Sequence, residues 1–387
     1  MRIESKPSQM NEKWDEETLF QDGDSYFSDI LNSIQTAKKT IKIETYIFDR
    51  DELGEKILNA LRDAAERGVK VRLLLDGAGC SEWDHDTTNL YRKHNFEIRF
   101  FHPLIWQRRN RKLWKYLNLN RIIRGFSLLN HRNHRKIFLF DDETAYLGSM
   151  NISGNHLKSS NGSNVWRDSS VRIKGDKISI LSESLDEAWN YFHNYSLRSI
   201  RKSELKDGSP LLYLNRTIRQ RRQNYHSLVK RLNSAQKSIL ITNPYFIPTL
   251  RLRRILKAAA SKDIRVATIF PEKSDVWQAK LAMEGFYSTL LKSGIEIHEY
   301  QPSMIHAKIL ITDDMALLGS SNLNTRSLFL DLEVDVEITH PENIEALKKQ
   351  FEEDLKKTKK IELMEWKKRP LLKKTAESIF ILFRWML

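Results

Sequence analysis

The sequence predicts an α/β protein made of two similar halves, each with a mixed β-sheet flanked by helices. Two observations lead to this prediction. Each half reads helix, strand, helix, strand, ending near residues 76 and 270, and this order is typical of sheets with parallel neighbouring strands. One polar motif also occurs once in each half, about 170 residues apart, a distance that indicates duplication of a whole domain rather than a short repeat.

The individual elements follow from runs of aliphatic and β-branched residues that alternate with helical segments. We expect strands at 42–48, 68–76, 239–246 and 264–270, with helices at 53–67 and 250–261. The turn-rich segment 202–210 separates the two halves. The predicted domains are therefore 1–205 and 206–365, followed by a tail, 366–387.

Composition limits the function. The formal net charge of +14 over 387 residues favours an anionic partner, which could be nucleic acid, anionic lipid or a phosphorylated substrate. The single cysteine, Cys80, excludes an internal disulfide and any site with several cysteine ligands. The sequence has no apolar run long enough to cross a bilayer, and residues 1–17 lack the apolar core of a signal peptide, so we expect a cytoplasmic protein.

The duplicated motif is H-x-K-x-x-x-x-D followed by Gly-Ser-x-Asn. The first copy supplies the candidate catalytic residues His134, Lys136 and Asp141, with Ser149 and Asn151 in support. The second supplies the candidate catalytic residues His306, Lys308 and Asp313, with Ser320 and Asn322 in support. One histidine alone is more often a buried structural residue, but two copies of a motif this long are not a chance event.

The spacing within the motif has a physical reading. Residues two apart on a strand point the same way, so each histidine lies beside its lysine. The two aspartates fall where a hairpin would turn, and the return strand brings the Ser and Asn residues alongside. Two facing copies supply two imidazoles and two cations, which suits a phosphoryl group: the lysines neutralise its oxygens, one histidine attacks phosphorus and the other protonates the leaving oxygen. The residues alone leave open which histidine does which.

With these motifs the chain resembles the phospholipase D superfamily over roughly residues 19–355. Local segments narrow the resemblance to bacterial cardiolipin synthases, most similar to the branch that lacks amino-terminal membrane spans; they are 44–48, 67–69, 166–168, 243–248 and 322–327. The resemblance implies two phospholipase D-like domains related by a pseudo-twofold axis. It also implies a phosphatidyltransferase that makes cardiolipin from two phosphatidylglycerol molecules through a covalent phosphatidyl-histidine.

The resemblance further implies that His134 is the nucleophile and His306 the acid. It places supporting carboxylates at Asp168 and Glu333, where each would hold a histidine in one tautomer. Asp331 stands where the family leads us to expect asparagine. We expect no cofactor and no metal, because the motifs supply cations and imidazoles rather than a cluster of carboxylates.

Three rival functions remain open at this point. The first is a phospholipase D-type hydrolase in which water is the acceptor, the second is a metal-independent phosphodiesterase nuclease, and the third is a binding module with a decayed site. Intact copies of both motifs disfavour the last. The acceptor alcohol and the oligomeric state are not readable from the sequence.

Two segments predict contact with a membrane. Residues 105–125 carry seven Lys or Arg, three aromatics and no acid, a composition typical of an interfacial helix on anionic lipid, although nucleic acid would attract it too. The tail repeats apolar residues at helical spacing, at Leu372, Ala376, Ile379, Phe380, Phe383 and Leu387. We interpret the tail as a membrane anchor rather than a helix docked on the second domain. The predicted partner is phosphatidylglycerol in a membrane rather than nucleic acid, and the predicted location is the cytoplasmic face of the bacterial inner membrane.

Overall fold

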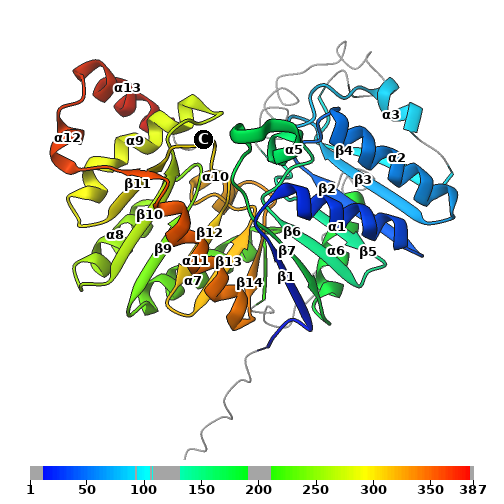
Figure 1. Cartoon of the computed structure of the whole chain (residues 1–387), viewed down its shortest axis with the longest axis horizontal. Coiled ribbons are helices and arrows are strands. Elements are labelled where there is room, and N and C mark those ends of the chain that lie inside the picture. Colours follow the sequence, from blue (N-terminus) through cyan, green and yellow to red (C-terminus); the bar gives the residue numbers. More distant parts are fainter. Residues whose placement is uncertain (1–11, 92–93, 105–106, 108–130, 191–210, 384–387) are drawn as a thin grey trace, which may run out of the picture.

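The computed structural model describes residues 12–91, 94–104, 107, 131–190 and 211–383, which form two mixed β-sheets flanked by helices (Figure 1). The first sheet has seven strands in the order β1-β7-β6-β5-β2-β3-β4, and the second has eight in the order β15-β11-β10-β9-β12-β13-β14-β8. The order 6-5-2-3-4 in one sheet repeats as 13-12-9-10-11 in the other. The duplicated α/β fold expected from the sequence is therefore confirmed.

The bounds of the first half are as follows. Its strands are β1 (Glu16–Phe20), β2 (Thr40–Thr45), β3 (Lys70–Asp76), β4 (Phe96–Phe101), β5 (Ile137–Phe140), β6 (Thr144–Gly148) and β7 (Ser170–Lys174). Its helices are α1 (Gly23–Thr36), α2 (Glu52–Glu66), α3 (His85–Tyr91), α5 (Lys158–Asn161) and α6 (Ile178–Asn190), with 3-10 turns η3 (Gly154–His156) and η4 (Gly162–Asn164).

The second half follows the same plan. Its strands are β8 (Leu212–Leu214), β9 (Ser238–Thr242), β10 (Arg265–Pro271), β11 (Glu296–Tyr300), β12 (Ile309–Thr312), β13 (Met315–Gly319), β14 (Val334–Ile338) and β15 (Thr358–Lys360). Its helices are α7 (Ile218–Ser234), α8 (Leu250–Ala260), α9 (Trp277–Leu291), α10 (Thr325–Phe329), α11 (Pro341–Leu355), α12 (Leu363–Lys367) and α13 (Leu371–Leu382).

The register shows why the motif strands lie at the centre of each sheet. β2 pairs in parallel with β3 and antiparallel with β5, while β9 pairs in parallel with β10 and antiparallel with β12. Every residue of β5 and β12 is buried, so these strands are covered on both faces. The crossover helices α2 and α8 each begin at a polar cap: the Asp51 carboxylate accepts from the Gly54 amide, and the Thr249 hydroxyl accepts from the Leu252 amide.

The hairpin turns that follow the motif strands are fixed by their aspartates. Asp141 and Asp313 adopt left-handed backbone conformations, with φ of 53° and 50°, which aspartate tolerates better than most residues. The Asp141 carboxylate accepts from the amides of residues 38–40, and the Asp313 carboxylate from those of residues 236–238. Each aspartate therefore ties the tip of its hairpin to the start of the neighbouring strand.

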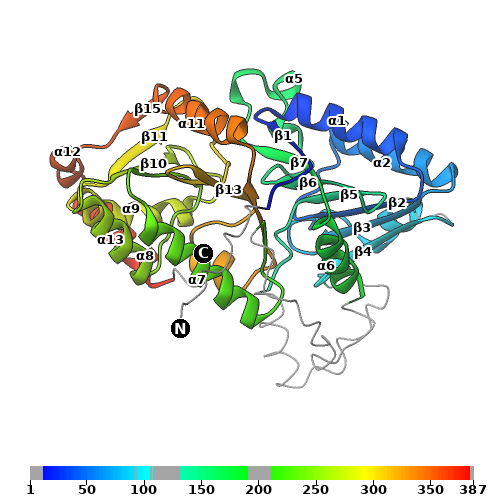
Figure 2. The ribbon, with the colours of Figure 1, turned by 90° about the horizontal axis from the view of Figure 1, so that it is seen from below.

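The two halves share one hydrophobic core. Leu147 and Val171 of the first sheet belong to the same buried cluster as Leu318 and Val336 of the second. Trp14 closes it, because its indole nitrogen donates to the Glu337 carbonyl at 2.9 Å. In the view from below, β1 and α11 meet at this junction (Figure 2), and the Glu17 carboxylate accepts from the Thr339 amide at 2.7 Å.

Two predicted membrane segments have different outcomes. Most of segment 105–125 lies outside the described residues; Gln107, which is described, is buried and donates to the Gly77 carbonyl. The prediction that the tail is not docked on the second domain is wrong for α13, which packs along α9, with Ile381 against Gly285 of that helix. The physical reason is a set of ion pairs and ring contacts at this interface. None of the helices in the described ranges is long and apolar enough to cross a membrane.

The shared core predicts that both halves unfold together. Leu318→Ala removes a side chain that is 1% exposed, and we expect a loss of about 2–5 kcal/mol of unfolding free energy. The thermal transition of the whole chain should move as one step in calorimetry. The exposed control Ile218→Ala should leave the transition within about 0.5 kcal/mol of wild type. Two separate transitions, with only one moved by Leu318→Ala, would contradict a common core.

Candidate active site

The two motif histidines lie where the two halves meet. His134 precedes β5 and His306 precedes β12, and each is fixed by a backbone hydrogen bond to the other half. The His134 amide donates to the Leu332 carbonyl at 2.9 Å, and the His306 amide donates to the Arg167 carbonyl at 2.8 Å. Isolated parallel bridges at Asn133–Leu332 and Arg167–Ile305 complete these contacts. The backbone thus aligns each histidine with the residue before an acid of the opposite half.

Each histidine is oriented by the acid of the other half. His134 Nδ1 lies 3.0 Å from Glu333 Oε1, and His306 Nδ1 lies 2.9 Å from Asp168 Oδ2. A carboxylate at Nδ1 holds the proton there and leaves Nε2 with a lone pair. The structure therefore brings Asp168 and Glu333 to the histidines, and neither half alone contains a complete pair.

The motif serines hold these acids in place. Ser149 Oγ donates to Asp168 Oδ1, and Ser320 Oγ donates to Glu333 Oε2 at 2.5 Å. All four side chains are buried. Because one carboxylate oxygen takes the serine hydroxyl, the carboxylate is kept in the orientation that meets the imidazole.

The motif lysines are buried beside the histidines. Lys136 Nζ donates to the His134 carbonyl at 2.7 Å, while Lys308 Nζ donates to the His306 carbonyl at 2.7 Å and lies 2.9 Å from His306 Nε2. Burial lowers the pKa of Lys136 to about 7 and that of Lys308 to about 8. Burial and the Lys308 cation also lower the pKa of both histidines, and Lys136 lowers that of His134 further, so the free site holds neutral imidazoles. An anionic ligand would relieve this accumulation of positive charge.

The two acids differ in their ionisation. Burial alone would raise the pKa of Asp168, but His306, His156 and Lys308 hold it below its ordinary value. Burial raises the pKa of Glu333 to about 7, in spite of Lys136 and a hydrogen bond from Ser320. The histidine–acid pairs are therefore equivalent in position but not in electrostatics.

The structure also shows residues that the sequence analysis did not assign to the site. The Tyr46 ring lies 4.8 Å from the His134 ring, and the Tyr245 ring lies 6.4 Å from the His306 ring. Lys136 Nζ and Lys308 Nζ lie 5.2 Å and 6.0 Å from the centres of these same tyrosine rings. Each tyrosine follows the strand beside its motif strand, so an alignment of the two halves could have identified the pair.

A third histidine adjoins the first acid. His156 is 1% exposed, and its Nδ1 lies 3.6 Å from the Asp168 oxygen that also meets His306. Its Nε2 accepts from the Asn151 amide at 3.2 Å, so the proton sits on Nδ1, facing the carboxylate. The Trp166 ring lies 5.5 Å from both imidazoles. No motif marks His156, because a lone histidine is a weak sequence signal.

The motif asparagines and aspartates have separate positions. Asn151 Oδ1 accepts from the Ile47 amide at 3.3 Å, and the buried Asn322 Oδ1 has no hydrogen-bond partner within the described ranges. Asp141 and Asp313 lie at the far ends of β5 and β12, bound to backbone amides. The structure does not bring these two aspartates to the histidines, and their contacts are those of hairpin clamps rather than catalytic groups.

Metal binding can be tested against the donor set. Within the described part of the chain, one group of side chains is close enough to share an ion: His156, Asp168 and His306, whose donor atoms lie within 4.8 Å of one another. A metal on these atoms would break the hydrogen bond between His306 and Asp168. The contacts within this group therefore indicate that Asp168 orients His306, rather than that the three side chains hold a metal ion.

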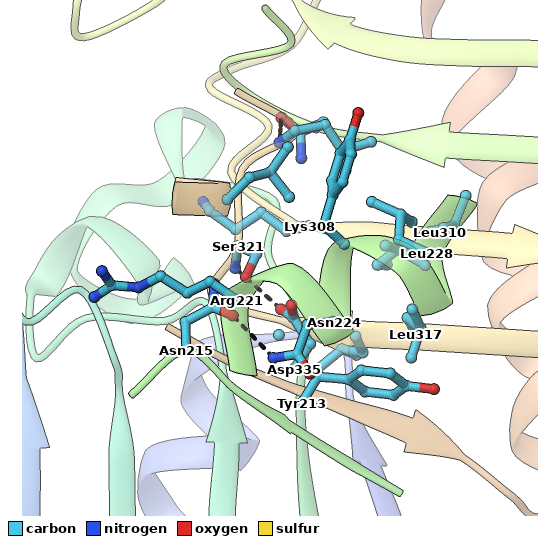
Figure 3. A pocket seen from close by; sticks show the side chains of 17 residues that line it. Tyr213, Asn215, Arg221, Asn224, Leu228, Lys308, Leu310, Leu317, Ser321 and Asp335 are labelled. Carbon is cyan, nitrogen blue, oxygen red and sulfur yellow. Dashed lines mark hydrogen bonds between the residues drawn. The ribbon is translucent and has the colours of Figure 1, made fainter. Parts of the chain in front are cut away.

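A small cavity of about 60 Å³ lies behind Lys308 in the second half (Figure 3). Apolar side chains such as Leu228, Leu310 and Leu317 line much of it, together with the polar residues Asn215, Arg221, Ser321 and Asp335. Burial raises the pKa of Asp335 to about 7. The space would hold a few water molecules but not a phospholipid head group.

Comparisons with known proteins agree with this geometry. A family profile described as cardiolipin synthase, PLD-like domain, matches residues 30–193 and 228–355. The chain is 31% identical over 372 residues to the probable cardiolipin synthase YwiE of Bacillus subtilis. The aligned region covers 94% of this chain and 71% of that protein. The chain is 30% identical over 373 residues to cardiolipin synthase 1 of Bacillus anthracis, covering 93% and 70%.

Among solved structures, phosphatidylserine synthase of Haemophilus influenzae has a TM-score of 0.68 at 18% identity, covering 96% of this chain and 95% of that one. This likeness shows a common fold. The family profile covers both motif-bearing halves, and the curated relatives match nearly the whole chain. The chain therefore belongs to the cardiolipin synthase family of phospholipase D-like proteins.

Proposed function

We propose that this protein is a phosphatidyltransferase that makes cardiolipin from phosphatidylglycerol through a covalent phosphatidyl-histidine. The observation that carries the proposal is the pair of imidazoles, each oriented at Nδ1 by an acid of the other half, with two buried lysines beside them. The names of the curated relatives support the choice of lipid.

The first step is attack on the donor phosphorus by His134 Nε2. The N–P bond forms while the P–O bond to glycerol breaks, and protonated His306 gives its proton to the departing glycerol oxygen. Lys136 and Lys308 neutralise the phosphoryl oxygens. The negative phosphodiester raises the proton affinity of His306, which burial and Lys308 keep neutral in the free site.

The second step reverses these roles. The hydroxyl of a second phosphatidylglycerol attacks phosphorus, its proton moves to His306, and the N–P bond to His134 breaks. Two observations support His134 as nucleophile: its side chain is 13% exposed against 4% for His306, and Lys308 Nζ already lies at His306 Nε2. Glu333 keeps the His134 proton on Nδ1 throughout.

Hydrolysis is the second candidate, because water could replace the lipid hydroxyl on the same intermediate. A nuclease would use the same imidazoles on a nucleic-acid phosphodiester.

The proposed site of action is a membrane surface, with the protein held peripherally at the cytoplasmic face of the inner membrane. The positive net charge of +14 supports contact with anionic lipid there.

The products distinguish these functions. Purified protein incubated with labelled phosphatidylglycerol should yield cardiolipin and glycerol, as resolved by lipid chromatography. Phosphatidic acid alone would indicate the hydrolase, and DNA cleavage without lipid turnover would indicate the nuclease.

Exhaustive chelation should leave the rate of cardiolipin formation largely intact, since lysines neutralise the phosphate. Activity lost with chelator and restored by magnesium would refute this mechanism.

Covalent trapping identifies the nucleophile. His134→Ala and His306→Ala should each lower kcat by about 10³-fold or more, because each removes one member of a concerted pair. Protein denatured during turnover of donor labelled in its phosphate should carry an acid-labile, base-stable label in wild type. We expect His306→Ala to retain slow labelling and His134→Ala to show none. The reverse pattern would exchange the two roles, and near-normal turnover in either variant would rule out a shared site.

The buried lysines predict an unusual pH dependence. A lysine with a lowered pKa is charged below that pKa and neutral above it, so kcat/KM for the anionic donor should fall as pH rises through about 7 to 8. An ordinary lysine would stay charged to about pH 10. The measurement is a profile of kcat/KM against pH, and Lys136→Arg should move the onset of the alkaline fall upward, because guanidinium stays protonated and the limb is then set by Lys308. A flat profile to about pH 10 would contradict the lowered values.

A further inference from the structure

The outward face of α13 is more apolar than the face that packs on the protein. Among its outward residues, Leu372 is 86% exposed, and Leu371, Ile379, Leu382 and Phe383 are exposed as well. The inward face includes Glu377, which is 1% exposed. An amphipathic helix of a soluble domain ordinarily turns its apolar side toward the core and its charged side toward water.

The charges on the inward side of α13 are paired, one with a residue just before the helix and one with α9. Arg369 Nη2 lies 2.6 Å from Glu377 Oε2, and Lys373 Nζ lies 2.9 Å from Glu284 Oε2 on α9. Phe380 and Ile381 complete the contact as partly buried members of the second-half core. These contacts fix the helix in one orientation, since rotating it would separate Lys373 from the buried Glu284 and would expose Phe380 and Ile381.

The polar groups of the outward side are also satisfied within the helix. Thr375 Oγ1 donates to the Leu371 carbonyl at 3.1 Å, and Ser378 Oγ donates to the Lys374 carbonyl at 2.9 Å. The outward face offers no acid among its described residues, so it is suited to an apolar or anionic environment.

A chain of contacts links this face to the catalytic centre. Tyr245, whose ring lies 6.4 Å from that of His306, donates to Asp275 Oδ1 at 2.5 Å. Two residues later Trp277 begins α9, and its ring lies 5.2 Å from the Phe380 ring of α13. Trp277 and Val276 are themselves exposed and extend the apolar area toward the site. Figure 1 shows α13 lying along α9.

We propose that this face, the α13 surface, docks on an anionic phospholipid bilayer and presents the catalytic centre to lipids in that bilayer. The α13 surface consists of the exposed apolar residues Leu371, Leu372, Ile379, Leu382 and Phe383 together with Val276 and Trp277. A helix of twelve residues is too short to span a bilayer and would lie in the interface. The inference deepens the proposed function by assigning its membrane partner to one surface.

Charge selects lipid over a second copy of the chain. Residues 367–383 contain five Lys or Arg and a single acid, Glu377, which is buried against Arg369. The exposed Lys367 and Lys368 lie at the end of α12, just before α13 begins, where they would meet anionic head groups. A twofold contact between two α13 surfaces would instead place two positively charged copies of this segment against each other.

The test replaces outward apolar side chains that make no core contacts. The triple variant Leu372→Ser, Ile379→Ser, Leu382→Ser should lower partitioning onto vesicles of phosphatidylglycerol and phosphatidylcholine by about 100-fold, as measured by co-sedimentation. The control Ile218→Ser, Leu250→Ser, Met315→Ser removes three exposed apolar side chains elsewhere and should bind like wild type. The wild-type protein should bind vesicles of phosphatidylcholine alone far more weakly.

Folding and turnover are measured separately from vesicle binding. The triple variant should keep the wild-type melting temperature and the wild-type rate on detergent-dispersed phosphatidylglycerol. Equal vesicle binding by the triple variant and wild type would overturn the proposal. So would a wild-type dimer, seen by sedimentation, that the triple variant converts to monomer. Normal vesicle binding without any cardiolipin formation would instead refute the proposed function and leave the α13 surface in place.

Discussion

The hydrogen bond between each catalytic histidine and the acid of the opposite half is the contact on which the rest of the structure depends. His134 meets Glu333, and His306 meets Asp168, so the chemistry exists only when the two sheets dock in one register. The parallel bridges just before these residues, and the core shared between the sheets, hold that register. Because a histidine must keep its proton on Nδ1 to act at Nε2, a small shift between the halves would affect both imidazoles at once.

The duplicated scaffold is symmetric, but its chemistry is not. Asp168 lies between two imidazoles and stays ionised, whereas burial brings the pKa of Glu333 to about 7. His156 has no histidine counterpart in the second half, where Ser327 stands five residues after the motif asparagine. Lys308 Nζ lies at His306 Nε2, while Lys136 Nζ donates to the His134 carbonyl and lies over the Tyr46 ring. Such differences allow one imidazole to serve as nucleophile and the other to exchange protons, although both occupy equivalent positions.

The sequence predicted the α/β duplication and the motif because both are local: strand periodicity and residue spacing can be read without knowing the tertiary structure. It could not predict that each acid serves the opposite half, since that depends on how the sheets dock. The aspartates Asp141 and Asp313 share the motif spacing with the histidines, yet a four-residue strand separates them from the site, and they bind backbone amides. For α13 the periodicity identified the apolar residues, but ion pairs with Arg369 and α9 decided which side faces the protein.

The crossed pairing also has a consequence for how the protein is made. His134 and its acid are 199 residues apart in the chain, and His306 and its acid are 138 apart. Contacts of such long range form late in folding, because the intervening chain must first be ordered. A nascent chain that has emerged only through the first half contains His134 and Lys136 but no partner for the imidazole. Catalytic competence therefore arises only after both motif-bearing halves have been synthesised, and translation products that lack the second half remain inert toward the lipids around them.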